Sequence, residues 1–276
     1  MKFCRFLGME GSRFGLVETR DGDDYIVSEL GSPQMQVNSA GVPELIVLPE
    51  PGSGKQLEEP FPLERAKLLI PFPIVSKVMC VGRNYAAHIR ELKHETPSEP
   101  MIFSKPPSSL LAHNGEIVRP SFSNRVDYEG ELGVIIGRRC HKMKQGEPAS
   151  DYILGYTVIN DVTARDLQEK DGQWTRSKGF DTFCPVGPII TTELDLSKGI
   201  QVQTRVNGEL RQNGNTSQML FDIDRIISHI SQFCTLLPGD LIATGTPEGV
   251  GPVKSGDVVE VSVDGIGTLR NPVIDE

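Results

Sequence analysis

Alternating apolar and polar residues predict β-strands through most of the chain. In the first quarter, short runs of this kind occur at 2–7, 14–18 and 45–48, separated by Gly-Asp and Pro-Gly turns. Proline-rich stretches near residues 60 and 71 then interrupt the pattern. We therefore predict a small β-rich N-terminal domain over residues 1–70 and a larger domain over residues 71–276.

The larger domain is also predicted to be rich in strands, with few helices. A buried strand at 77–82 leads into a helix at 83–92, and an amphipathic helix is predicted at 223–234, capped by Asp222. The dipeptides Asn207-Gly208 and Asp264-Gly265 predict two hairpins. Residues 172–188 are dense in glycine and proline and predict a long ordered loop. The pattern indicates a β-rich α+β fold.

Composition and charge restrict the partners. The formal net charge is −9, and no cluster of lysine and arginine supplies the basic face that nucleic-acid binders need. No apolar run is long enough to cross a membrane. The five cysteines are dispersed and the N-terminus has no secretory signal, so we expect reduced thiols, a cytoplasmic location and a small-molecule substrate.

The acidic stretch around residue 129 is the first candidate for chemistry. On one continuous strand, Asp127, Glu129 and Glu131 would project from the same face. Carboxylates this close repel one another unless a cation lies between them, which favours a hard divalent metal. The alternative is a solvated strand face.

Further candidates lie at the ends of predicted elements. His88 and Glu91 fall on one face of the helix at 83–92, where a carboxylate would make the imidazole a better general base; the alternative is a surface pair. Asp161 ends a strand and is either a ligand or a helix N-cap. Lys105 ends another strand, and Thr246 lies in a glycine-rich loop that could cradle a carboxylate.

Six motifs, in this order along the chain, resemble the fumarylacetoacetate hydrolase family from about residue 77 onward. They are Val81-Gly-Arg-Asn-Tyr-Ala-Ala-His88, Asp127-Tyr-Glu-Gly-Glu-Leu-Gly133, Ile159-Asn-Asp-Val-Thr-Ala-Arg-Asp166, Lys178-Gly-Phe-Asp-Thr-Phe-Cys-Pro-Val-Gly-Pro188, Val206-Asn-Gly-Glu209 and Thr244-Gly-Thr-Pro-Glu-Gly-Val-Gly251. The resemblance implies a mixed β-roll catalytic domain, bound Mg²⁺ or Mn²⁺, and a homodimer.

The resemblance also implies roles for individual residues. The metal ligands would be Glu129, Glu131 and Asp161, with Asp127 behind them. The catalytic residues would be His88, Glu91 and Lys178. The substrate-binding residues would be Arg83, Tyr85, Lys105, Arg165, Gln168 and Thr246. The segment from His88 to Glu95 would form a mobile lid.

Members of this family act on 2-oxo acids, and two kinds of reaction follow from the resemblance. The first is metal-dependent C–C cleavage, by oxaloacetate decarboxylation or acylpyruvate hydrolysis through a metal-bound enolate. The alternative is isomerisation or tautomerisation of a 2-oxo or 2-hydroxy-diene dioate. A third hypothesis, from a different class, is a non-catalytic β module that holds a structural ion; His88, Glu91 and Lys178 beside the carboxylates argue against it.

Overall fold

The computed structural model describes residues 1–73, 76–91, 95–144 and 146–276. Strands dominate and the sheets are mixed, which confirms the predicted β-rich α+β class. The N-terminal strands are β1 (Lys2–Gly8), β2 (Gly11–Arg20), β3 (Asp23–Leu30), β4 (Gln34–Val37), β5 (Pro43–Val47) and β6 (Gln56–Pro62), followed by the 3₁₀ turn η1 (Leu63–Arg65).

The middle of the chain contains the short helices. Its elements are β7 (Val78–Gly82), α1 (Ala86–Glu91), β8 (Met101–Lys105), η2 (Pro107–Ser109), β9 (Leu110–Leu111), β10 (Ile117–Arg119), β11 (Val126–Tyr128), β12 (Gly130–Ile136), η3 (Ala149–Tyr152), β13 (Ile153–Asn160), β14 (Thr163–Ala164), α2 (Arg165–Asp171) and α3 (Trp174–Gly179). The remaining elements are β15 (Cys184–Thr191), η4 (Leu196–Lys198), β16 (Gln201–Val206), β17 (Glu209–Asn215), η5 (Thr216–Gln218), α4 (Ile223–Phe233), β18 (Leu241–Ala243), β19 (Gly251–Pro252), β20 (Val258–Val263) and β21 (Gly267–Asp275).

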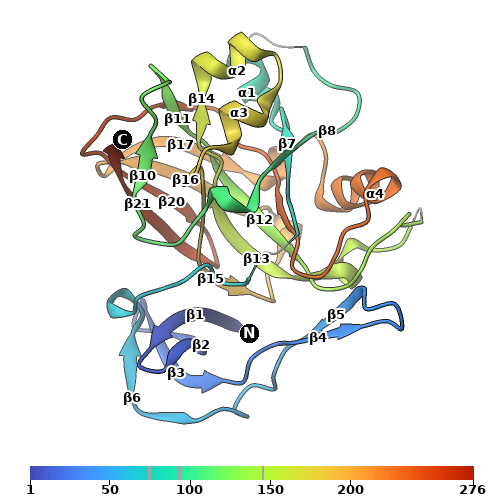
Figure 1. Cartoon of the computed structure of the whole chain (residues 1–276), viewed down its shortest axis with the longest axis vertical. Helices are drawn as coiled ribbons and strands as arrows, with labels where there is room; N and C mark the ends of the chain where they lie inside the picture. Colours follow the sequence, from blue (N-terminus) through green and yellow to red (C-terminus); the bar gives the residue numbers. More distant parts are fainter. Residues whose placement is uncertain (74–75, 92–94, 145) are drawn as a thin grey trace.

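One large sheet extends through the molecule in the order β6-β3-β2-β1-β15-β13-β12-β18-β7-β8, with β9 beside β15. The N-terminal strands join it because β1 pairs antiparallel with β15, Lys2 opposite Thr191. They form the lower layer in Figure 1. The boundary between residues 70 and 71 stays a prediction.

A five-stranded sheet, β10-β21-β20-β16-β17, packs against the large one and encloses the main core. The sheets approach closely at Gly130, where an added Cβ would lie 2.2 Å from Thr204 Oγ1 and 2.8 Å from Val261 Cγ1. A side chain there would separate the sheets, so glycine is required at the first residue of β12.

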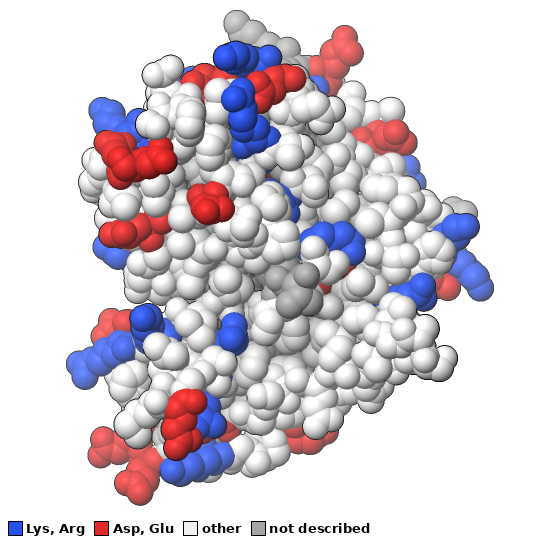
Figure 2. Space-filling view, viewed as in Figure 1, with Lys and Arg blue, Asp and Glu red and all other residues white. Residues whose placement is uncertain are grey.

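The helices α1, α2 and α3 gather at one end of the molecule, beside β14 and near the upper ends of β7 and β8 (Figure 1). The fourth helix, α4, lies on one side and buries Ile226, Ile227 and Ile230. None of the described helices is both long and apolar enough to cross a bilayer. On the face drawn in Figure 2, acidic and basic side chains are interspersed among neutral ones.

Several local predictions are confirmed. Asn207 and Gly208 have φ values of 52° and 79°, as a type I′ turn requires, and connect β16 to β17. The Asp222 side chain accepts a hydrogen bond from the Arg225 N–H and caps α4. The helix expected at 83–92 is α1, which is shorter at its start; Leu92 and the lid positions up to residue 94 lie outside the described residues.

Two predictions are wrong. Residues 172–188 are not one loop, because they contain α3 and the start of β15. Asp127 and Glu131 do not share one strand, because the chain leaves β11 at Glu129 and enters β12. β11 pairs with β14 and β19, whereas β12 pairs with β13 and β18, so the carboxylates belong to two different sheets.

Candidate active site

Three buried carboxylates meet where the chain passes between these sheets. Glu129 lies between β11 and β12, Glu131 on β12, and Asp161 directly after β13. One oxygen from each lies within 4.8 Å of the other two, and each residue is at least 95% buried. Backbone pairing holds them together, because the Asp161 N–H donates to the Glu129 carbonyl at 2.8 Å. Asp161 therefore belongs to the site and is not a helix cap.

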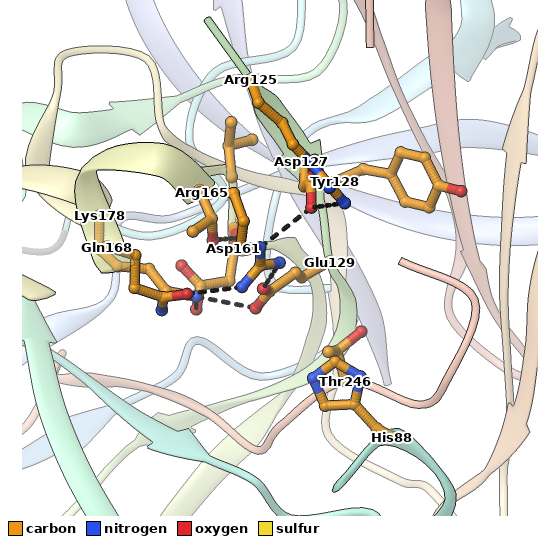
Figure 3. Close-up of polar contacts among 12 residues, drawn as sticks. His88, Arg125, Asp127, Tyr128, Glu129, Asp161, Arg165, Gln168, Lys178 and Thr246 are labelled. Carbon is orange, nitrogen blue, oxygen red and sulfur yellow. Dashed lines mark hydrogen bonds and ion pairs between the residues drawn. The ribbon is translucent and has the colours of Figure 1, made fainter. Parts of the chain in front are cut away.

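Arginine side chains neutralise one side of the cluster. Arg165 donates from Nη2 to Glu129 Oε1 at 2.5 Å and from Nε to Asp127 Oδ2 at 3.0 Å (Figure 3). Asp127 is fully buried and also accepts two hydrogen bonds from Arg125. Asp127 thus anchors Arg165 and is not part of the cluster formed by the other three carboxylates.

Two buried lysines complete the network. Lys178 donates to Glu129 Oε2 at 2.8 Å and to Asp161 Oδ2 at 2.6 Å, and Lys105 donates to Asp161 Oδ1 at 2.6 Å. Burial alone would raise the pKa of Glu129, but the charges of Lys178 and Arg165 outweigh it and hold that pKa well below its usual range. Glu129 is therefore ionised at neutral pH.

Glu131 differs from its neighbours because it has no ion pair among the described residues. One carboxylate oxygen accepts the Gly245 N–H at 2.7 Å. Burial, followed by the negative charges of Asp161 and Glu129, raises the pKa of Glu131 well above its usual range. A hard divalent cation would relieve this repulsion, so three oxygen donors in this arrangement fit Mg²⁺ or Mn²⁺.

A histidine faces the same site from α1. His88 is 5% exposed, and its Nδ1 lies 3.3 Å from Glu91 Oε2. Glu91 is exposed and accepts the Gly249 N–H from the glycine-rich loop at 3.2 Å. The contact between Nδ1 and Glu91 leaves Nε2 as the ring nitrogen available to a substrate.

The carboxylates, His88 and Lys178 line one cavity of about 40 Å³. Of the residues predicted to bind substrate, Arg83, Arg165, Gln168 and Thr246 also line it, whereas Lys105 lies behind Asp161. The Gln168 side-chain oxygen accepts a hydrogen bond from Arg165 at 2.7 Å. The Thr246 hydroxyl donates to the Gly130 carbonyl and accepts from Gln212, so it supports the start of β12.

Tyr85 is placed elsewhere. It is 1% exposed and lines a separate cavity of about 110 Å³ with Arg90 and Glu248. Its hydroxyl has no hydrogen-bond partner in the described part of the chain. Burial, followed by the charge of Glu131, raises the pKa of this hydroxyl.

Arg83 is the cavity-lining cation with no ion pair in the described ranges. Its backbone has a φ of 58°, which is rare for a residue with a Cβ. The next residue holds this turn, because the Asn84 side chain donates to the Phe221 and Thr244 carbonyls and accepts the Phe221 N–H. The turn thus places Arg83 in the lining of the cavity.

Sequence reasoning missed four residues around the site. Trp174 and Phe103 line the cavity, Arg125 pairs with Asp127, and Asn160 accepts the Glu129 N–H through Oδ1 at 2.9 Å. Only the Asn-Asp pair at the end of a predicted strand offered a signal for Asn160. The others are identified by long-range contacts.

Comparisons with known proteins agree with this architecture. The oxaloacetate tautomerase YisK of Bacillus subtilis is 41% identical over 227 residues, which cover 77% of this chain and 75% of that protein. The crystal structure of a 5-carboxymethyl-2-hydroxymuconate delta-isomerase from Mycobacterium smegmatis aligns with a TM-score of 0.83 and 42% identity over the whole of both chains. A 2-hydroxyhepta-2,4-diene-1,7-dioate isomerase structure from Mycobacterium marinum aligns with a TM-score of 0.82 and 40% identity, covering 100% of this chain and 99% of that one.

Residues 77–274 match the family described as fumarylacetoacetate (FAA) hydrolase C-terminal. This segment contains all three clustered carboxylates, His88 and Lys178. The chain belongs to the fumarylacetoacetate hydrolase family of enzymes.

Proposed function

We propose that this enzyme catalyses proton transfer on a 2-oxo acid, as a divalent-metal-dependent tautomerase or isomerase of a 2-oxo or 2-hydroxy-diene dioate. The observation that carries the proposal is that His88 and the three carboxylates Glu129, Glu131 and Asp161 line one cavity. The names of the relatives compared above, a tautomerase and two isomerases, support it.

The chain itself supplies the acid-base groups. His88, oriented by Glu91 through Nδ1, would accept a proton at Nε2 from the carbon next to the 2-oxo group. The carbon–hydrogen bond breaks as a carbon–carbon double bond forms, and negative charge collects on the 2-oxo oxygen. Return of the proton to that oxygen gives the enol, and its return to a different carbon gives an isomer. No oxidant or reductant is needed.

Cationic groups in the cavity would stabilise the negative charge. Burial would lower the pKa of Lys178, but the charges of Asp161 and Glu129 raise it above its usual range, so the ammonium persists at neutral pH. Mg²⁺ or Mn²⁺, held by Glu129, Glu131 and Asp161, would supply Lewis acidity toward the substrate oxygens. Arg83, with no ion pair among the described residues, would bind a carboxylate of the substrate.

Carbon–carbon cleavage is the second candidate. Loss of CO₂ from oxaloacetate develops the same enolate charge, and hydrolysis of an acylpyruvate additionally needs a water activated by a base. The His88–Glu91 pair at 3.3 Å favours this candidate, because it could activate that water as well. The two candidates differ in whether carbon leaves the substrate.

Product analysis tests both candidates. The enzyme is incubated with Mg²⁺ or Mn²⁺ and oxaloacetate, acetylpyruvate or 2-hydroxyhepta-2,4-diene-1,7-dioate in D₂O, and products are followed by NMR. We expect faster keto–enol conversion or isomer formation and deuterium at the carbon next to the 2-oxo group, without loss of carbon. Rapid formation of pyruvate would support cleavage instead. Metal binding with no reaction of any acid would support the non-catalytic module.

We also propose a cytoplasmic homodimer. The described cysteines are all free thiols and four of the five are buried, which is consistent with a reducing compartment. The dimer is an expectation from the family resemblance. Sedimentation velocity tests it, and a monomer at micromolar concentration would contradict it.

A further inference from the structure

The sole tryptophan of the chain forms part of the cavity wall. Trp174 begins α3, one turn before Lys178 on the same helix. Its ring meets Phe103 of β8 edge-on, with the ring centroids 5.0 Å apart and an interplanar angle of 72°. Two aromatic residues from different elements therefore hold each other in a fixed position beside the charged groups.

Gly82 lets the indole lie against the backbone of β7. A Cβ at this position would lie 2.7 Å from Cζ3 and 2.9 Å from Cη2 of Trp174, closer than real Cβ contacts. Gly82 also lines the cavity. The absence of a side chain at residue 82 and the large side chain at residue 174 are thus complementary.

The aromatic wall is close to the charged end of the cavity. Lys178 Nζ lies 5.0 Å from the Phe103 ring centroid and 5.9 Å from the Trp174 ring centroid. The cavity measures about 40 Å³, whereas pockets for drug-sized ligands measure roughly 300–1,000 Å³. A substrate whose 2-oxo end lies at Lys178 has room for few further carbons before it meets the indole.

We infer that Trp174, seated on Gly82 and braced by Phe103, sets the length of acid that the site accepts and selects four-carbon 2-oxo dicarboxylates over six-carbon and longer ones. Trp174 is a specificity-determining residue here and moves no proton. The choice of 2-oxo acids as ligands rests on the proposed function. Selection by ligand length does not depend on the reaction. It favours a short dioate over the seven-carbon dioate named for one relative.

The test compares oxaloacetate with 2-oxoadipate, which is longer by two methylenes. In the wild-type protein with Mn²⁺, calorimetry should show oxaloacetate bound about 100-fold more tightly, since one methylene changes selectivity by roughly 10-fold or more. Trp174→Ala should reduce this ratio at least about 10-fold, mainly by improving binding of 2-oxoadipate. Trp174→Phe should give an intermediate ratio. Because it preserves the aromatic contact with Phe103, it serves as the test if the alanine variant does not fold.

Two further variants sharpen the test. Gly82→Ala should displace the indole and weaken oxaloacetate binding about 10-fold or more. Because Trp174 is the sole tryptophan, its fluorescence reports the displacement of the indole in Gly82→Ala. The same signal follows ligand binding in that variant and in the wild type. Thr175→Ala, on the same helix with an exposed side chain, is the matched control and should retain the wild-type ratio.

The results separate the two proposals. A wild-type ratio near one, or folded Trp174→Ala and Trp174→Phe variants that keep the wild-type ratio, would overturn the length selection. Length-selective binding without proton exchange on any acid would uphold Trp174 as the wall and reject the proposed reaction. Proton exchange with equal binding of both acids would support the proposed reaction and reject Trp174 as the residue that selects ligand length.

Discussion

Lys178 and Asp161 form a buried ion pair, with Nζ 2.6 Å from Oδ2 and both side chains at most 2% exposed. The pair joins α3 to the end of β13, and Lys178 Nζ also contacts Glu129. A positive charge thus lies directly beside two of the three carboxylates that fit a divalent metal.

Replacing this lysine should separate metal binding from catalysis. Lys178→Met removes a cation that competes with the metal for Glu129 and Asp161, so Mn²⁺ affinity should increase roughly 10-fold or more. Proton-transfer activity should fall because the ammonium no longer stabilises the developing charge. Calorimetric titration with Mn²⁺ measures the first effect, with exposed Lys170→Met as control. Unchanged or weaker affinity would contradict this account.

The three clustered carboxylates should be required for metal binding but not for folding. Glu129→Gln, Glu131→Gln and Asp161→Asn should each abolish measurable Mn²⁺ binding, with unchanged far-UV circular dichroism. The exposed residue Glu169 of α2, changed to Gln, is the control. Three variants that all keep wild-type affinity would remove the metal site from this cluster.

Glu131→Gln should also change stability without metal. The pKa of Glu131 is raised in the folded protein, so its ionisation opposes folding as the pH rises above the unfolded-state value of about 4.3. Gln removes that charge and can still accept the Gly245 N–H. In chelator at pH 7, the variant should therefore unfold at a higher temperature than the wild type. A lower unfolding temperature would show that the ionised carboxylate is stabilised in the absence of metal.

Asp127 should matter for stability. This fully buried carboxylate holds both Arg125 and Arg165. Removing its charge should lower the free energy of unfolding by on the order of 3 kcal/mol. Asp171→Asn, in a more exposed pair with Arg176, should change the free energy of unfolding much less. If urea unfolding shows equal losses in the free energy of unfolding for the two variants, Asp127 contributes no more to stability than an exposed ion pair does.

The His88–Glu91 pair should act as a unit. His88→Ala should reduce kcat/KM for proton transfer by about 10²–10⁴-fold, because general-base catalysis is lost. Glu91→Gln should reduce it in the same direction, and the double variant should be little worse than the worse single variant. Full activity of both single variants would make the pair a surface contact, and additive losses would indicate independent roles.

His113, which lies outside the candidate site, should make the stability of the protein depend on pH. Burial, together with the charge of Arg270, lowers the pKa of His113 to about 4. The unfolded chain binds this proton near pH 6.5, so stability should fall as the pH decreases from about 6.5 to 4, by on the order of 3 kcal/mol. His113→Asn can still accept the Arg270 N–H and should flatten this part of the curve. His141→Asn, at an exposed position, is the control and should leave the curve unchanged. Equal curves of stability against pH for all three proteins would contradict this role of His113.

Local sequence determined much of the fold. The turn at Asn207-Gly208 and the cap at Asp222 depend on residues within a few positions of each other, so backbone preferences suffice to predict them. The spacing of Asp127, Glu129 and Glu131 was enough to suggest a metal site, although Asp127 is not part of the cluster. Asp161 was named as the third ligand only by the resemblance to the family.

Tertiary structure alone decided the surroundings of those carboxylates. Asp127 faces arginines because the chain changes sheets at Glu129, and no periodicity in residues 127–131 encodes which strands will pair with them. Trp174 lies against Gly82 because α3 packs over the end of β7, bringing residues 92 positions apart into contact. Local propensities act over a few residues, whereas the charge partners and the walls of the cavity depend on how whole sheets and helices pack.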